Sequence, residues 1–223
     1  MYVMNYEFNN PKKIIVIGDI HGDIKRLKNI LFDANIINKN LEWISLDTIV
    51  VQLGDQIDSL NREDNVKEWE VIKDIEVIYF TDFLDNIARS KNSLFISLIG
   101  NHEFMNVLGD FSYVSGNSNF AGRNKFFNSN GPIRQILYNR PLIIKIDNAL
   151  FSHSKLLKEH YEILKKYNKN IFYINELWRK FLLDELNDDI DKELFKNLIL
   201  NNGIFFNRIH DNNASFLKDI NIK

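Results

Sequence analysis

The sequence contains no cysteine, and this absence excludes several classes of protein at once. Without thiols the chain has no disulfide scaffold, no thiolate zinc site and no cysteine nucleophile. Any metal site must therefore use His, Asp, Asn or Glu side chains. Proline and glycine are also scarce, with 3 and 9 residues in 223, and we find no low-complexity linker.

The chain also lacks an excess of charge of either sign. Lys and Arg number 28 against 30 Asp and Glu, so the net charge is −2. This balance supplies no global positive field, and we expect neither a nucleic-acid partner nor a membrane partner. Residues 1–13 lack the basic and apolar pattern of a secretory signal, and no later run approaches ~18 apolar residues. We therefore expect a soluble cytoplasmic protein.

A repeated pattern in the first hundred residues predicts an α/β fold. Three short apolar runs each end in glycine followed by a polar side chain, in the segments 12–19, 48–55 and 94–101. Helical stripes at 23–31 and 65–89 separate them. In an open α/β sheet, ligands bind outside the carboxyl ends of the strands, so we expect these three loops to meet.

The rest of the chain is expected to be mostly helical, with no internal repeat and no domain boundary. Glycine and polar residues at 106–131 predict an irregular excursion that could act as a lid. The segments 142–146 and 149–152 predict a hairpin. Helices are expected at 156–167, 174–186 and 190–200.

The strand-end loops carry side chains typical of metal sites. Asp19 and His21 are two residues apart, so in an extended segment both point to the same side. One such loop alone is more often a turn or a helix cap, but three in order favour a metal site. Glu103 is expected to orient or cap rather than to bind metal. The remaining candidates are Asp55, Asp58, Asn101, His102 and, after the hairpin, His153.

These loops resemble a known family. The segments 18–22, 54–58 and 100–103 resemble the three signature blocks of calcineurin-like metallophosphoesterases, in the form used by phosphoprotein phosphatases. Residues 103–114 and 131–141 further resemble the Shewanella-like protein phosphatases. The resemblance implies the α/β metallophosphoesterase fold, a β-sandwich flanked by helices. The expected domain covers 12–210, followed by a short tail at 211–223.

The resemblance also implies roles for the candidates and two divalent cations, which we predict to be manganese, with iron or zinc as alternatives. Two such ions clamp the attacking and leaving oxygens of a phosphoryl transfer and turn a bridging water into hydroxide. His102 is the implied general acid, with Asp58 orienting it. The implied ligands are Asp19 and His21 for the first metal, Asp55 as the bridge, and Asn101 and His153 for the second.

Two features depart from the family pattern. Ser59 follows Asp58 where such phosphatases have a phosphate-binding arginine, and Arg62, Arg123 and Arg208 are the candidate replacements. No Gly-His-Thr block follows 205–208, so we expect the last C-terminal strands to be missing and the second metal to be weakly held. The exposed sheet edge would need cover from a partner chain or from residues 214–222.

The predicted function is a metal-dependent phosphomonoesterase. Its substrate is expected to be a phosphorylated protein, at Ser/Thr or Tyr, or a small phosphomonoester. A degenerate relative that works by binding alone is the first alternative, and a phosphodiesterase or dinucleotide hydrolase is the second.

Overall fold

A computed structural model describes residues 5–58, 68–114, 122–201, 203–207 and 215–222. By its internal contacts the chain forms two compact units. One covers residues 11–140 and is called the 11–140 unit. The other combines residues 1–10 with 141–223 and is called the 141–223 unit. The sequence carries no sign of a boundary at Arg140, because both sides have ordinary globular composition.

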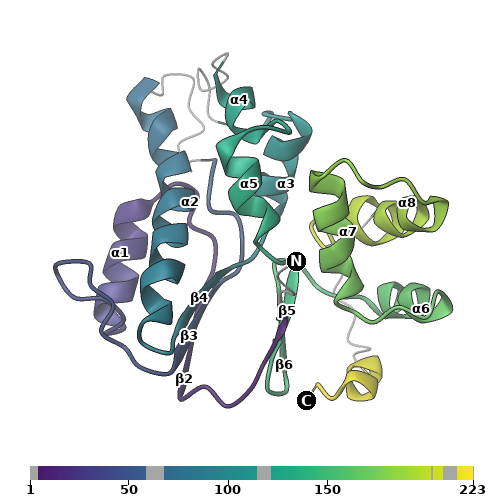
Figure 1. Cartoon of the computed structure of the whole chain (residues 1–223), viewed down its shortest axis with the longest axis horizontal. Coiled ribbons are helices and arrows are strands. Elements are labelled where there is room, and N and C mark those ends of the chain that lie inside the picture. Colours follow the sequence, from purple (N-terminus) through teal and green to yellow (C-terminus); the bar gives the residue numbers. More distant parts are fainter. Residues whose placement is uncertain (1–4, 59–67, 115–121, 202, 208–214, 223) are drawn as a thin grey trace. The chain divides into compact units, whose positions relative to one another are not determined.

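The 11–140 unit contains a parallel sheet with the strand order β2-β3-β4 (Figure 1). Ile15 lies opposite Val50, which in turn lies opposite Phe95. Parallel neighbours require crossovers, and helices fill both of them. The three predicted strands and the two helices are thereby confirmed, although residues 65–67 lie outside the described part. The elements are β2 (Lys13–Ile17), α1 (Ile24–Asp33), β3 (Thr48–Gln52), α2 (Glu68–Arg89) and β4 (Leu94–Ser97).

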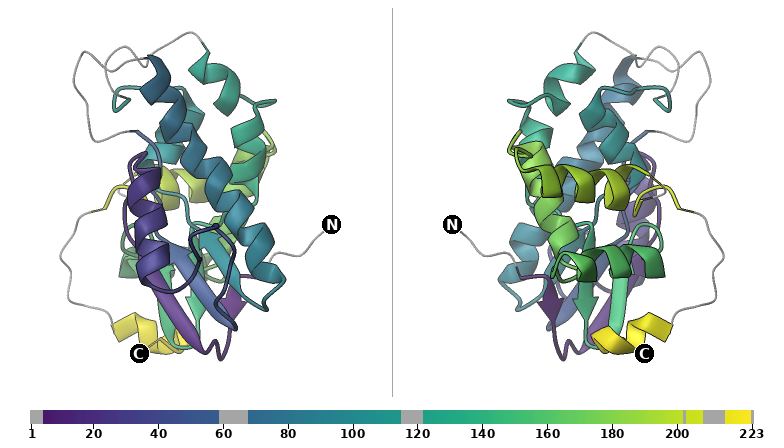
Figure 2. Two further views of the ribbon diagram at one scale, coloured as in Figure 1. Left: turned by 90° about the vertical axis from the view of Figure 1, so that its left-hand side faces the viewer. Right: turned by 90° about the vertical axis from the view of Figure 1, so that its right-hand side faces the viewer.

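A hydrophobic core joins this sheet to α1 and α2, which lie over one of its faces (Figure 2). Side chains alternate along β2, so Ile17 enters the core while Ile14 and Val16 are 37% and 48% exposed. Leu27 of α1 and Leu84 of α2 are fully buried in the same core. The core thus holds the sheet rigidly and leaves its strand ends free to carry polar loops.

The irregular excursion expected at 106–131 is wrong in part, because helices occupy residues 106–108 and 123–127. They are α3 (Asn101–Leu108) and α4 (Arg123–Phe127), and α5 (Pro132–Tyr138) follows. Residues 115–121 lie outside the described part. The prediction failed because α3 begins directly at the strand-end loop and ends at Gly109, whose φ of 77° suits a C-terminal glycine.

The 141–223 unit contains a second sheet, ordered β1-β5-β6. β5 and β6 form the predicted antiparallel hairpin, and β1 pairs parallel to β5. The side chain of Asn175 accepts hydrogen bonds from the backbone N–H groups of Leu142 and Ile143, which ties α7 to the sheet. The strands are β1 (Glu7–Phe8), β5 (Ile143–Ile146) and β6 (Ala149–Ser152); the helices are α6 (Lys158–Lys166), α7 (Tyr173–Leu182), α8 (Asp189–Phe195), the π-helix η2 (Lys196–Leu200) and the 3₁₀ helix η3 (Ser215–Ile220).

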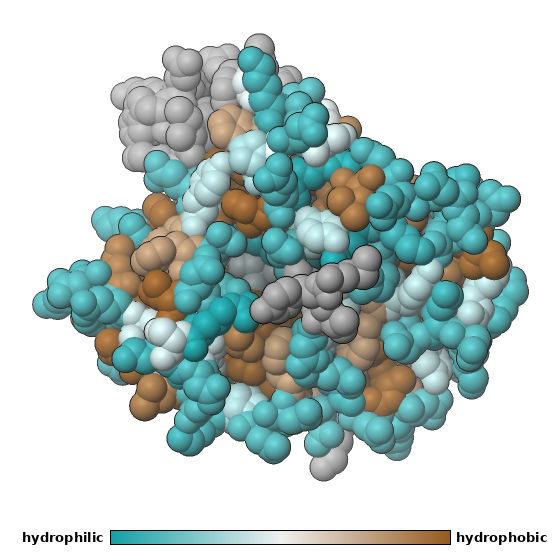
Figure 3. Space-filling model, viewed as in Figure 1, coloured by the Kyte–Doolittle hydropathy of each residue, from teal (hydrophilic) through white to brown (hydrophobic). Residues whose placement is uncertain are grey.

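Among the described residues, β6 is the last strand of the chain. The terminal segment that we expected to cover a sheet edge is helical in η3, where Phe216 stacks on Tyr161 of α6 with ring centroids 5.5 Å apart. In the described ranges no helix is both long and apolar enough to cross a bilayer. On the face drawn in Figure 3, apolar residues form separate patches between polar ones.

Candidate metal centre

Three polar side chains converge at the carboxyl ends of β2, β3 and β4. His21 follows β2, Asp55 follows β3, and His102 follows β4 as the second residue of α3. One ligand atom from each lies within 4.8 Å of the others. The loops meet because the three strands run parallel and therefore end at the same edge of the sheet. The imidazole of His21 and the carboxylate of Asp55 are donors suited to a divalent transition metal, and the ring of His102 reaches the same point.

The two imidazoles turn nitrogen atoms towards the carboxylates. His102 Nε2 lies 3.8 Å from Asp55 Oδ2, and His21 Nε2 lies 3.9 Å from Asp19 Oδ2. The other ring nitrogen of His21, Nδ1, lies 3.2 Å from the carbonyl oxygen of Ile57. A carbonyl only accepts, so Nδ1 carries the proton and Nε2 keeps a lone pair for a metal.

The backbone at this edge adopts unusual conformations. His21, Asp55 and Asp58 have φ values of 48°, 53° and 64°, in the left-handed region that costs non-glycine residues energy. Gly54 has a φ of 96°, and a Cβ on it would lie 2.4 Å from the backbone nitrogen of Gly100. The first two blocks therefore bend sharply, and the second and third touch through glycine.

Glu103 joins the loops that follow β3 and β4. Its Oε2 accepts the N–H groups of Asp55 and Gly100, both at 2.9 Å, and its Oε1 accepts those of Gln56 at 2.7 Å and Ile57 at 3.3 Å. Burial raises the pKa of Glu103, and the neighbouring charge of Asp55 adds to this effect. These bonds confirm the prediction that Glu103 orients the loops.

His102 and Asp58 form a buried hydrogen-bonded pair. His102 Nδ1 donates to Asp58 Oδ2 at 2.8 Å, and Asn106 Nδ2 donates to both oxygens of Asp58, at 3.1 and 3.0 Å. Burial opposes a charged imidazole, but the hydrogen bond to Asp58 and the charge of Asp55 raise the pKa of His102 overall. The bond to Asp58 occupies Nδ1 and leaves Nε2 turned towards Asp55.

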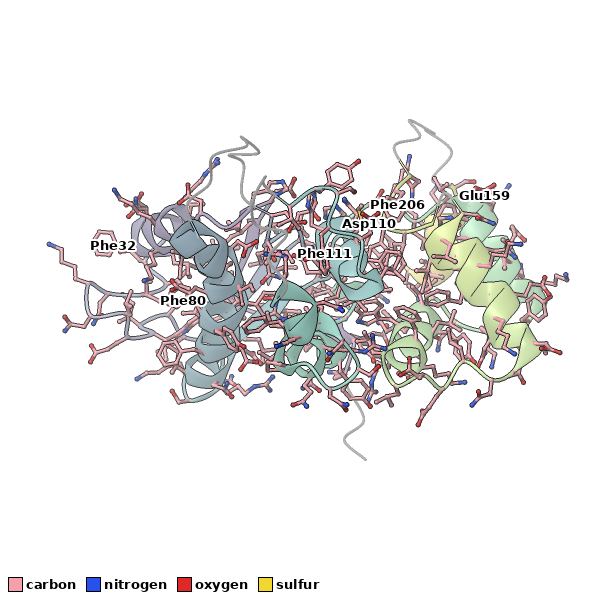
Figure 4. The ribbon with its side chains drawn as sticks, turned by 90° about the horizontal axis from the view of Figure 1, so that it is seen from above. Phe32, Phe80, Asp110, Phe111, Glu159 and Phe206 are labelled. Atoms are coloured by element: carbon pink, nitrogen blue, oxygen red, sulfur yellow. The ribbon has the colours of Figure 1, made fainter. Side chains whose placement is uncertain are left out.

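Tyr113 lies beside this pair. Its ring meets the His102 ring edge-on, with centroids 5.3 Å apart, and the side chain is 43% exposed. A turn after α3 brings it there, in which Asp110 accepts the N–H of Ser112 at 3.0 Å. Asp110 and Phe111 are labelled where α3 ends (Figure 4). Tyr113 thus borders the site with an aromatic surface.

The other predicted residues have different outcomes. Asn101 is the first residue of α3, next to the cluster in sequence. His153 follows β6 in the 141–223 unit, whereas Asp55 and Asn101 belong to the 11–140 unit. The ligand set of these three residues therefore stays a prediction. Arg62 and Arg208 lie outside the described residues.

Arg123 differs from the expectation that it contacts phosphate. It has no exposed surface, and its guanidinium already bonds Asp58, Asp74 and Asn106. Sequence reasoning gave no role to Asn106, Asp74 or Tyr113. The spacing of Asn106, four residues after His102 on one helix, was a usable signal; Asp74, on a distant helix, offered none.

The chain matches a known protein family and is similar to curated relatives. The protein-family model described as calcineurin-like phosphoesterase matches residues 12–217. A relative in Plasmodium berghei, Shewanella-like protein phosphatase 1, is 34% identical over 153 residues, covering 65% of this chain and 39% of the relative. Shewanella-like protein phosphatase 2 of Arabidopsis thaliana is 30% identical over 113 residues, covering 51% and 26%. The chain thus spans well under half the length of these relatives.

Solved structures share the fold. A structure titled as a cold-active protein tyrosine phosphatase superposes with a TM-score of 0.76 at 23% identity, over 99% of this chain and 64% of that one. A cold-active protein-tyrosine phosphatase of a psychrophilic Shewanella species gives 0.77 at 24%, over 99% and 66%. The expected metallophosphoesterase fold is confirmed.

Proposed function

Because the chain belongs to the calcineurin-like phosphoesterase family, we propose that it is a metal-dependent phosphomonoesterase with a dinuclear metal site. The observation that supports this most is the His102–Asp58 pair beside the cluster of His21 and Asp55. A metal cluster alone could serve binding, whereas a buried imidazole held by a carboxylate beside it suits proton donation.

The donor set fits divalent cations. Asp19, His21 and Asp55 would hold the first ion, and Asp55, Asn101 and His153 the second. His21 supports this assignment, because its Nδ1 bond to Ile57 leaves Nε2 for coordination. Bound there, such cations act as Lewis acids towards phosphoryl oxygens and make water more acidic. Manganese is our proposed metal, with iron or zinc as alternatives.

His102 acts as the general acid in this proposal. Asp58 holds the Nδ1 proton, which fixes the ring so that Nε2 points to the cluster. The Nε2 proton passes to the ester oxygen as its bond to phosphorus breaks, and the leaving group departs as an alcohol or phenol. Tyr113 borders the same ring, with the two ring centroids 5.3 Å apart.

The proposed substrate is a phosphorylated protein, at Ser/Thr or at Tyr, or a small phosphomonoester. The names of the relatives support this class, since they are called protein phosphatases and a protein tyrosine phosphatase. Arg62 and Arg208 remain the proposed phosphate contacts. The cytoplasmic location stays a prediction.

Hydrolysis of p-nitrophenyl phosphate tests the function. The metal-depleted chain should be inactive, recover turnover with manganese and lose it again with chelator. Asp55→Asn should lose bound metal and activity together, while His102→Asn should keep metal and turn over at least about 10²-fold more slowly. The exposed Asp33→Asn is the matched control and should behave as the unchanged protein.

Two results would overturn the proposal. Wild-type activity in both Asp55→Asn and His102→Asn would exclude the site. Faster turnover of bis(p-nitrophenyl) phosphate than of the monoester would instead identify a phosphodiesterase.

A further inference from the structure

Arg123 occupies the first position of α4 and has no exposed surface. Its Nε donates to Asn106 Oδ1 at 2.7 Å, and its terminal nitrogens donate to Asp58 Oδ1 at 2.7 Å and Asp74 Oδ1 at 3.2 Å. Its guanidinium carbon lies 5.5 Å from the centre of the Phe127 ring. A phosphate in solvent could reach these nitrogens only by displacing buried partners.

The Asp58 carboxylate is engaged at both oxygens. Oδ2 accepts His102 Nδ1, Oδ1 accepts Arg123, and Asn106 Nδ2 reaches both. The backbone N–H of Asp58 donates to Asp74 Oδ2 at 3.1 Å, and Arg123 lies 2.9 Å from that same oxygen. Arg123 therefore bridges the two carboxylates, while Asp58 alone touches the imidazole.

Charge balance makes this bridge important. Asp58 and Asp74 are 1% and 3% exposed, so bulk solvent does not reach either carboxylate. A buried charge that loses its partner is strongly unfavourable, so without the guanidinium these carboxylates would rotate or take up a proton. Lysine cannot restore the arrangement, because an ammonium lacks the planar fork that spans two acceptors.

We propose that Arg123 is a positioning residue for proton donation, which fixes the carboxylate plane of Asp58 and through it the direction of His102. This role rests on the proposed phosphomonoesterase function and replaces the phosphate contact expected from the sequence. In this role α4 positions the Arg123 guanidinium against the His102–Asp58 pair, whose two members come from other segments of the 11–140 unit.

The role has a chemical signature. Hydrolysis forms a bond from a water oxygen to phosphorus and breaks the bond from phosphorus to the ester oxygen. The electron pair of the broken bond takes the proton from His102 Nε2, and the water releases one of its protons to solvent. A strongly basic alkoxide needs this proton, whereas dinitrophenolate leaves without it. Misdirecting His102 therefore harms alkyl esters selectively.

The kinetic test compares an alkyl phosphomonoester, O-phosphoserine, with 2,4-dinitrophenyl phosphate. Arg123→Lys should lower kcat for phosphoserine by about 10²-fold and for the dinitrophenyl ester by less than about threefold, at unchanged metal content. The control is Arg140→Lys, since Arg140 is also buried and donates to Gln56, Thr81 and the carbonyl of Ile78. It should leave the ratio of the two rates unaltered.

A double-mutant cycle tests whether Arg123 acts through Asp58. In an Asp58→Asn background, Arg123→Lys should change kcat for phosphoserine by less than about twofold, because the linking carboxylate charge is already gone. Independent, multiplying effects would overturn the proposal. Equal losses on both esters in Arg123→Lys would also overturn it and indicate a structural role only.

Proton NMR gives a readout without turnover. The hydrogen-bonded Nδ1 proton of His102 should give a downfield imidazole signal, assigned by its absence in His102→Asn. Arg123→Lys should shift or broaden this signal, and Arg140→Lys should leave it in place. An unchanged signal in Arg123→Lys overturns the positioning role, even for a chain that hydrolyses neither ester, in which case the proposed function fails separately.

Discussion

Glu103→Gln tests how the loops after β3 and β4 are held together. The carboxylate accepts four backbone N–H groups, two on each oxygen, from the loops after β3 and β4. Glutamine has nearly the same shape but presents one oxygen and one NH₂ group, so two of the four N–H groups lose their acceptor and face a donor. Each buried, unsatisfied N–H costs about 1 to 3 kcal/mol, so we expect the free energy of unfolding to fall by about 2 to 6 kcal/mol.

Urea unfolding measures this loss, and amide hydrogen exchange locates it. The backbone amides of Asp55, Gln56 and Gly100 should exchange faster in Glu103→Gln, and affinity for manganese should fall by about 10- to 100-fold because Asp55 is no longer anchored. Glu42→Gln, at an exposed site in the same unit, should stay within about 0.5 kcal/mol. A loss below about 1 kcal/mol with unchanged amide exchange would refute the reasoning.

Two further predictions concern packing and pH. Gly100→Ala would place a Cβ 2.2 Å from Asp55 Oδ1 and should abolish manganese binding, as measured by calorimetry. A Cβ on Gly18 would have nothing within 4 Å, so Gly18→Ala should preserve manganese binding. Manganese binding in both variants would contradict the close packing of Gly100 against Asp55. Burial opposes ionisation of Asp191, but its hydrogen bond from Lys180 holds its pKa below the ordinary value. The stability from that bond is present above the unfolded pKa of about 4 and is lost as pH falls through the folded pKa, so thermal unfolding should show a steeper acid loss than in Asp191→Asn. Parallel pH curves for the two proteins would exclude this contribution.

Local signals in the sequence were sufficient to predict the sheet of the 11–140 unit and to bring His21, Asp55 and His102 together. The apolar runs that end in glycine predicted β2, β3 and β4. Asp23 caps α1 by accepting the N–H of Arg26. His21, Asp55 and His102 meet because parallel strands end at one edge, which is a rule of topology that the residue order already contains.

The role of Arg123 depended on contacts between distant segments. Its partners are 49 and 65 residues away in Asp74 and Asp58, and no periodicity links them. In the sequence, Ser59 stands where such phosphatases have a phosphate-binding arginine, so Arg123 was one of the candidate replacements. Burial decides the matter differently, because a fully enclosed guanidinium is available only to the carboxylates around it.

The proposed function requires that the loops after β2, β3 and β4 hold a metal. Anomalous X-ray diffraction at the manganese edge, on crystals grown with manganese from protein of measured phosphatase activity, tests this most directly. We predict an anomalous peak bound by Asp19, His21 and Asp55, which is absent in Asp55→Asn. An active protein whose crystals show no peak at these residues would contradict the account.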